Sequence, residues 1–126
     1  MHMSIRTYQD LTVWQRSIDL IEAVYSLTSA FPQDERFGLT SQMRRAAVSI
    51  AANIAEGYGR NSRKEYAYFV GIAFGSSREL ETLLVVANRI GITVEDNCTQ
   101  SRALLDECCR MLNVLYRKLR DSPQEA

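Results

Sequence analysis

The sequence predicts an all-α protein in which 126 residues form one up-down antiparallel four-helix bundle. Three observations lead to this prediction. Apolar residues recur at steps of three and four in four separate stretches, which is the period of an amphipathic helix. No stretch alternates apolar and polar residues as a half-buried strand does. Short segments with proline, glycine or capping residues separate the stretches, and short connections place antiparallel helices side by side. We therefore expect helices over residues 11–30, 41–58, 62–90 and 94–120 of a single domain, 1–126.

The first expected helix has Asp10 as its N-cap and ends before Pro32, because a proline disfavours the helical conformation at the residue before it. Its inward face is expected to hold Leu11, Trp14, Ile18, Ile21, Tyr25 and Thr28. Leu20, Val24 and Leu27 widen this apolar arc beyond what a single seam requires. The excess predicts that the helix is buried on two sides.

The second expected helix is the element around which the chain is organised. Thr40 is its expected N-cap, and Gly57 and Gly59 provide the permissive backbone for its end. Its inward face is expected to hold Met43, Ala46, Ala47, Ile50, Ile54 and Tyr58. Alanines at positions 46, 47, 51, 52 and 55 keep its wall low, so we expect other helices to approach it closely.

A polar stripe follows the same helix at helical spacing, formed by Arg45, Ser49, Asn53 and Glu56. Two interpretations stay open. The stripe is either a solvated face, or a polar seam against the third helix or against a neighbouring subunit. The alanines around it favour the seam, because long exposed charges normally flank such a stripe on a free face.

The third expected helix starts at Asn61 or Ser62, of which Ser62 has capping-box spacing with Glu65, and stops at Gly91. Its apolar face is Tyr66, Phe69, Val70, Ala73, Leu80, Leu83, Leu84 and Ala87. Gly71 and Gly75 lie in mid-helix, where each glycine costs about 1 kcal/mol relative to alanine. We expect both glycines to face the alanine wall of the second helix and to extend the seam of its polar stripe.

The fourth expected helix opens at Thr93, and Glu95 and Asp96 in its first turn suit the helix dipole. Its seam is Ser101, Leu104, Cys108, Met111, Leu115 and Leu119, thickened by Leu105 and Leu112. A polar tail follows over residues 121–126.

Composition narrows the function. Hydrophobic residues make up 46% and charged residues 24%, as in an ordinary globular protein. Fifteen basic and fifteen acidic side chains cancel, which argues against strong non-specific nucleic-acid binding but leaves room for a local patch. No apolar run approaches the ~18–20 residues of a membrane span, and no hydrophobic leader opens the chain. Cys98, Cys108 and Cys109 are an odd number with no Cys-x-x-Cys, so we expect free thiols and a cytoplasmic protein without membrane contact.

The residues do not indicate catalysis. A di-metal bundle site needs Glu-x-x-His pairs, and the only histidine is His2, which with Met1 we interpret as a cloning remnant. Serines and cysteines therefore have no histidine base. Glu79 and Glu81 are two apart and face different sides of a helix. Gly57-Tyr58-Gly59 ends a helix and follows no strand, so it is not a phosphate loop. We predict no enzyme, no cofactor, no metal site and no small-molecule substrate.

Charge placement is more informative than total charge. In an up-down bundle, the end of the second helix, the start of the third and the end of the fourth meet at one end. That end is expected to collect Arg60, Arg63, Lys64, Arg117, Lys118 and Arg120. Asp10, Glu65 and Asp121 partly offset them. Either these cations serve helix capping and solubility, or they form a surface for phosphate or an acidic partner.

Three segments carry a family resemblance. They are Tyr8-Gln-Asp-Leu-Thr-Val-Trp-Gln15, the string Ser-Ile-x-x-Asn-Ile-Ala-Glu-Gly at 49–57, and Ile-Ala-Phe-Gly-Ser-Ser-Arg-Glu-Leu-Glu-Thr at 72–82. With them the chain closely resembles the 23S ribosomal RNA intervening-sequence proteins, also called S23-like proteins, over most of residues 8–119. These small bundles are encoded within inserts of ribosomal RNA genes or elsewhere in bacterial chromosomes.

The resemblance implies a non-enzymatic homopentamer. A related protein, the accessory variability protein of diversity-generating retroelements, pairs with a reverse transcriptase and contacts nucleic acid through a strongly basic surface. This chain differs in being neutral overall. The expectation is a cyclic homo-oligomer that acts as a binding or scaffold module for structured RNA or for a nucleic-acid-handling protein. The alternative is a purely protein-directed scaffold with no nucleic-acid contact.

Overall fold

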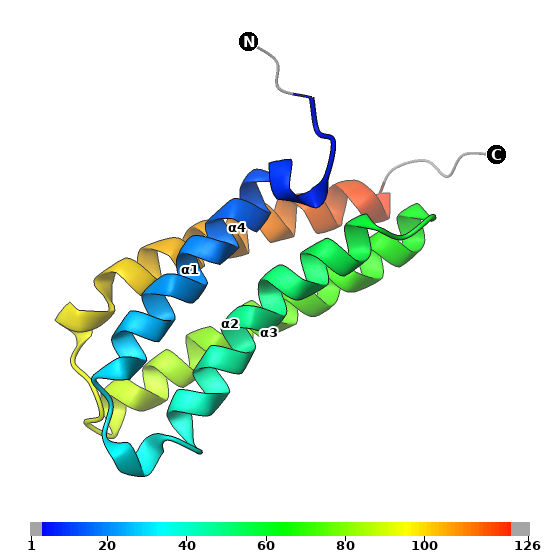
Figure 1. The fold of residues 1–126 in the computed structure, drawn as a ribbon. Coiled ribbons are helices and arrows are strands. Elements are labelled where there is room, and N and C mark those ends of the chain that lie inside the picture. Colours follow the sequence, from blue (N-terminus) through cyan, green and yellow to red (C-terminus); the bar gives the residue numbers. More distant parts are fainter. Residues whose placement is uncertain (1–3, 122–126) are drawn as a thin grey trace.

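A computed structural model describes residues 4–121 as four long helices joined by short turns, and no strand occurs in that range. The long helices are α1 (Thr12–Ser29), α2 (Leu39–Tyr58), α3 (Arg63–Arg89) and α4 (Thr99–Asp121). Short 3-10 helices are η1 (Tyr8–Asp10), η2 (Gln33–Glu35) and η3 (Glu95–Cys98). Each long helix packs on the next one in the chain. α4 also packs on α1, which closes the bundle. The predicted four-helix fold is confirmed (Figure 1).

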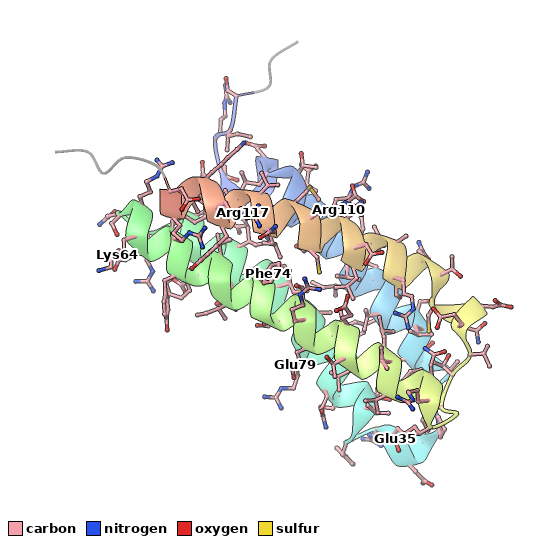
Figure 2. All side chains as sticks on the ribbon, turned by 180° about the vertical axis from the view of Figure 1, so that it is seen from behind. Glu35, Lys64, Phe74, Glu79, Arg110 and Arg117 are labelled. Atoms are coloured by element: carbon pink, nitrogen blue, oxygen red, sulfur yellow. The ribbon has the colours of Figure 1, made fainter. Side chains whose placement is uncertain are left out.

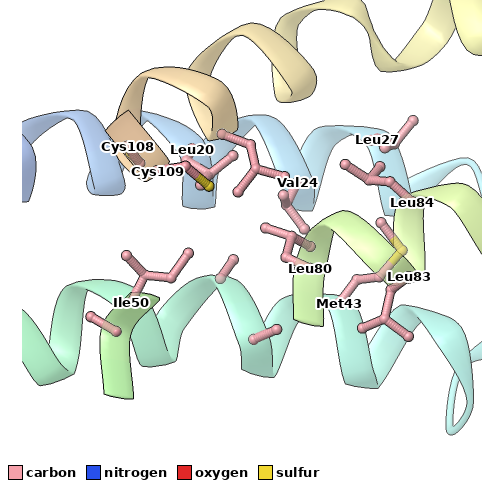
Figure 3. Close-up of a cluster of buried hydrophobic side chains, with 14 of the residues drawn as sticks. Leu20, Val24, Leu27, Met43, Ile50, Leu80, Leu83, Leu84, Cys108 and Cys109 are labelled. Atoms are coloured by element: carbon pink, nitrogen blue, oxygen red, sulfur yellow. The ribbon is translucent and has the colours of Figure 1, made fainter. Parts of the chain in front are cut away.

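The core lies along the bundle axis and receives side chains from all four helices (Figure 3). The large side chains that lie almost wholly out of solvent include Leu20, Val24, Met43, Ile50, Ile54, Leu80, Leu84, Leu105 and Leu112. Burying one such side chain contributes about 1.5–3 kcal/mol. The apolar faces predicted for the second and third helices are correct, since Met43, Ile50, Leu80 and Leu84 all lie on them.

The inward face predicted for the first helix differs from the buried face in the structure. The structure buries Val13, Ser17, Leu20, Ala23, Val24, Leu27 and Thr28. Trp14, Ile18 and Ile21 are only half-buried, and Tyr25 is exposed. The true face runs through small residues, because α1 approaches both α2 and α4 along it. Ser17 can occupy this line because its hydroxyl donates to the carbonyl of Trp14 (2.6 Å), so no polar group is left unsatisfied.

Two predicted caps at the start of the chain are wrong. Asp10 belongs to η1, where its carboxylate accepts from the backbone N–H groups of Arg6 (2.9 Å) and Thr7 (3.2 Å). α1 therefore begins after Leu11 without a side-chain cap. Thr40 lies inside α2, and its predicted role is taken by Glu35, whose Oε1 accepts from the N–H of Leu39 (3.1 Å). Both errors arise because a 3-10 turn precedes each helix: the carboxylate of Asp10 serves that turn itself, and the carboxylate of Glu35 reaches from it to α2.

The predicted ends of the third helix are correct, but the predicted start of the fourth is wrong. Ser62 is the N-cap of α3 and accepts from the N–H of Glu65 (3.0 Å), as predicted. Gly91 follows the end of α3 with φ of +82°, a conformation that glycine adopts without steric cost, also as predicted. Thr93, however, does not open the fourth helix, because η3 intervenes and α4 begins at Thr99. The expected helix over 94–120 is thus two elements. The expected tail beyond Asp121 lies outside the described residues.

The close approach of α2 and α3 occurs at a different glycine from those predicted. A Cβ placed on Gly57 would lie 2.8 Å from Cβ of Phe69 and 3.2 Å from the carbonyl oxygen of Tyr66. Gly71 instead faces α4, with Cε1 of Tyr116 3.3 Å from where its Cβ would be, and Gly75 meets nothing within 4 Å. The two helices converge toward the short turn that joins them, so the tightest contact falls beside that turn and not in mid-helix.

This placement predicts opposite effects for two matched glycine substitutions. Gly57→Ala should lower the free energy of unfolding by about 1–3 kcal/mol, because its methyl group would meet the α3 backbone. Gly75→Ala should raise that free energy by up to about 1 kcal/mol through helix propensity. Urea titration followed by circular dichroism measures both. A stable Gly57→Ala variant, or a loss of stability in Gly75→Ala, would contradict the packing described here.

Candidate functional site

The basic end of the molecule is the charge cluster that the sequence singled out. Arg63 at the start of α3 donates from Nη2 to the main-chain carbonyl of Lys118 near the end of α4 (3.4 Å). This contact brings the two ends of the long helices together, although the residues are 55 positions apart. We call the following six side chains the basic end: Arg60, Arg63, Lys64, Arg117, Lys118 and Arg120. All six are exposed.

Nearby carboxylates engage two of these cations. Arg60 Nη2 lies 3.0 Å from Glu56 Oε2, and Arg120 Nε lies 2.8 Å from Asp121 Oδ1. The hydrogen bond from Arg120 holds the pKa of Asp121 below its ordinary value, so that carboxylate stays charged. Exposed pairs of this kind contribute about 0–1 kcal/mol and are screened by salt. Both guanidinium groups can therefore exchange their carboxylates for another anion at little cost.

Aromatic rings accompany the arginines at this end. The guanidinium of Arg60 lies over the ring of Phe69 (4.7 Å to the centroid), and that of Arg120 lies over the ring of Tyr116 (5.5 Å). Such pairs hold a flexible side chain in place and present a flat cationic surface. Tyr68 adds an exposed ring that contacts Phe69 edge-on (5.2 Å). Cations beside flat rings are the groups that bind phosphates and unpaired bases.

A cavity of about 360 Å³ opens between α3 and α4 next to the basic end. It is lined by Gly71, Phe74, Asn113, Tyr116, Arg117 and Arg120. Figure 2 looks onto this side of the bundle, with Phe74 on α3 and Arg117 on α4. Sequence reasoning missed Phe74, Asn113 and Tyr116. Their signal is the helical spacing of 113, 116, 117 and 120 on one helix together with 71 and 74 on the other.

The polar stripe of α2 is a seam with α3 over part of its length. The hydroxyls of Ser49 and Ser76 share a hydrogen bond (2.8 Å), and Asn53 Nδ2 donates to the carbonyl (2.8 Å) and hydroxyl (3.0 Å) of Ser49. Arg45 and Glu56 lie exposed at its margins. The stripe therefore combines both interpretations, a packed polar centre and solvated ends. Gly71 and Gly75 are not part of this seam.

Comparison with known proteins decides the family. The family model described as "23S rRNA-intervening sequence protein" matches residues 9–114. The chain belongs to this family. The resemblance predicted from the sequence is thus confirmed.

A solved structure supports the fold of this family member. It is the crystal structure of a protein with unknown function from the S23 ribosomal protein family of Bacteroides thetaiotaomicron VPI-5482. The two chains superpose with a TM-score of 0.75 at 20% sequence identity, over 84% of this chain and 99% of that chain. At this identity the likeness concerns the fold alone. Among curated proteins, no sequence matches this chain.

Two further features, a metal site and a membrane-spanning helix, can be described for residues 4–121. No group of three or more His, Cys, Asp or Glu side chains in that range is placed to hold a metal ion. No helix there is long and apolar enough to cross a membrane. Met1 and His2, interpreted as a cloning remnant, lie outside the described residues.

The three cysteines are free and buried. Cys109 Sγ donates to the hydroxyl of Ser77 (3.2 Å), which ties α4 to α3. Burial raises the pKa of the Cys108 thiol from 9.0 to about 12, and the neighbouring Cys109 and Glu107 add to the rise. Cys108 therefore stays protonated at neutral pH and serves as a packing residue. Only the thiolate acts as a nucleophile or a metal ligand.

This pKa predicts a stability loss at alkaline pH. The unfolded chain ionises the thiol of Cys108 above pH ~9, while the folded chain keeps it protonated up to about 12. The contribution of the protonated Cys108 thiol to the free energy of unfolding is therefore complete below pH 9.0 and is lost as the pH rises toward 12. Urea titrations at several pH values should show the free energy of unfolding falling less steeply in Cys108→Ala than in the parent. Equal slopes in this window would contradict the raised pKa.

Proposed function

We propose that this member of the family is a non-enzymatic, self-assembling helical bundle that binds structured RNA through its basic end. The observation that carries the proposal is the meeting of the Arg63 and Lys118 segments at one end of the bundle. The proposal assigns no catalytic, cofactor, metal or small-molecule role to any residue. It places the protein in the cytoplasm without membrane contact, where three free thiols are in keeping with a reducing compartment.

The physical basis is local concentration of charge in a chain whose formal net charge is zero. Each phosphate that a lysine or arginine neutralises releases counterions, so binding weakens as salt is raised. Contacts to the phosphate backbone carry no direct sequence information. The expected binding is therefore salt-sensitive, with little sequence preference.

Self-assembly would multiply these contacts. The family resemblance implies a ring of five copies, and a closed ring would repeat the basic end five times around one rim. Exposed apolar side chains on α2 and α3 offer surface for such contacts: Val48, Ile72, Val85 and Val86. Several weak contacts that engage one RNA together gain affinity through effective concentration. The alternative function is a scaffold that contacts only proteins, among them proteins that handle nucleic acids.

Charge reversal at the basic end tests RNA binding. A labelled RNA hairpin, its two strands joined by a non-nucleotide linker so that every nucleotide is paired, is titrated with the parent and with Arg63→Glu/Arg117→Glu, and fluorescence anisotropy is measured at several salt concentrations. We expect the double variant to bind about tenfold more weakly. Its slope of log affinity against log salt should also be smaller, because about two phosphate contacts are lost.

The matched control is Arg36→Glu/Arg89→Glu, which makes the same charge change with exposed arginines at the opposite end of the bundle. It should bind like the parent. Thermal melting checks that loss of the Arg63–Lys118 hydrogen bond has not unfolded the variant. If the parent does not bind the hairpin even at low salt, or if both double variants bind equally, the protein-directed scaffold becomes the better function.

Native mass spectrometry tests the assembly. Five chains of 14.3 kDa predict a particle of about 72 kDa at micromolar concentration. The basic-end variant should keep this mass, because the charges lie outside the proposed contacts between copies. A spectrum with only monomer would contradict the assembly, whereas a different closed ring would contradict the number five alone.

A further inference from the structure

The cavity between α3 and α4 has three kinds of wall that together match the parts of one nucleotide. Phe74 and Tyr116 supply flat rings, Asn113 supplies an amide, and Arg117 and Arg120 supply guanidinium groups. Rings stack on bases, an amide pairs with the polar edge of a base, and guanidinium groups bind phosphate. Its volume of about 360 Å³ is within the range of small-ligand sites, about 300–1,000 Å³.

Asn113 gives the cavity an amide group without a hydrogen-bond partner in residues 4–121. Two other half-buried asparagines on the long helices donate to the carbonyl four residues earlier, Asn53 to Ser49 (2.8 Å) and Asn88 to Leu84 (2.9 Å). Asn113 is half-buried as well, yet its amide makes no hydrogen bond within residues 4–121. The amide therefore keeps two donors and an acceptor available to a ligand, which is the pattern that reads a base edge.

Gly71 explains how the ring of Tyr116 reaches this position. A Cβ on Gly71 would lie 3.3 Å from Cε1 of Tyr116, tighter than ordinary contact, and 3.8 Å from Cδ1, so this edge of the ring lies against bare α3 backbone. Glycine at this mid-helix position costs about 1 kcal/mol, and close packing with α2 does not account for it. Its place in the fold is to let Tyr116 form one wall of the cavity.

The arginines of the cavity are able to accept a phosphate. Arg120 lies over the ring of Tyr116 and pairs with the exposed Asp121, and Arg117 forms no ion pair within 4 Å in the described part of the chain. Both belong to the basic end, so a phosphate in the cavity would lie on the same surface as the RNA backbone contacts proposed above. A strand that runs along the basic end can thus place one residue in the cavity without leaving that surface.

We propose that this cavity binds a single unpaired nucleotide of RNA, with its base against Tyr116 and Asn113 and its phosphate at Arg117 and Arg120. The proposal rests on the RNA binding proposed for the basic end, and it adds a preference for RNA with an unpaired residue. A free mononucleotide offers the same chemistry. We commit to RNA because Arg117 and Arg120 belong both to the cavity and to the basic end, so a longer strand can contact both, whereas a free nucleotide reaches the cavity alone.

The experiment compares two hairpins that differ only by one bulged nucleotide, again by fluorescence anisotropy at fixed salt. The parent should bind the bulged hairpin about tenfold more tightly than the paired one, as expected for one stacked base. Asn113→Ala and Tyr116→Leu should each reduce this preference severalfold, measured as the ratio of the two affinities, and Asn113→Ala should leave affinity for the paired hairpin unchanged. Asn113→Ala breaks no hydrogen bond of the described chain, so it keeps the test valid if Tyr116→Leu unfolds.

Tyr25→Ala is the matched control, because the guanidinium of Arg44 lies over the ring of Tyr25 (4.4 Å) as Arg120 lies over Tyr116, but outside this cavity. It should keep the full preference. Asp121→Asn should strengthen binding of both hairpins, because it releases Arg120.

Each outcome separates the two proposals. Equal binding of both hairpins by the parent overturns the nucleotide site and leaves RNA binding intact, whereas binding of neither overturns both. A preference that survives Asn113→Ala and Tyr116→Leu, or that Tyr25→Ala also removes, overturns the assignment to this cavity. Full competition by a free mononucleotide at equal concentration overturns the commitment to RNA.

Discussion

The packing of α2 on α3 governs the arrangement of the other elements. At Gly57 the two backbones are so close that a methyl group would meet the neighbouring helix. Farther along, the Ser49–Ser76 hydrogen bond fixes the rotation of one helix against the other. With spacing and rotation fixed, the short turn after Tyr58 delivers Arg60 and Arg63 to one end of the bundle. α4 then packs on α3 and brings Lys118 to the same end.

How far the sequence predicts this fold depends on what each pattern determines. Apolar spacing identifies α2 and α3 and their inward residues, because each has one dominant face. α1 has an apolar arc wider than one face, so spacing alone does not choose between Trp14 and Leu20 as its centre. Helix starts were predicted correctly at Ser62, whose own side chain caps. They were wrong at Thr40, because the capping carboxylate of Glu35 comes from a separate turn.

The candidate site divides in the same way. The meeting of Arg63 with Lys118 follows from up-down topology alone, so the sequence predicts it. The cavity depends on the rotation of α3 about its own axis, which decides whether Gly71 meets α2 or Tyr116. A half-turn of α3 about its axis would therefore turn Gly71 from Tyr116 of α4 toward α2. Glycine spacing predicts a close approach at Gly71 correctly, but the predicted partner, the alanine wall of α2, is wrong, because Gly71 meets Tyr116 of α4.

Helix capping does not fully account for the basic end. Lys118 and Arg120 lie in the last turn of α4, where the helix dipole favours cations. Arg63 and Lys64 lie in the first turn of α3, where the same dipole disfavours them. Arg63 offsets this cost by donating to an α4 carbonyl. For Lys64 neither an ion pair nor a hydrogen bond is found within residues 4–121. The stability of the bundle does not explain a cation at the unfavourable end of a helix, whereas the anionic partner proposed above would.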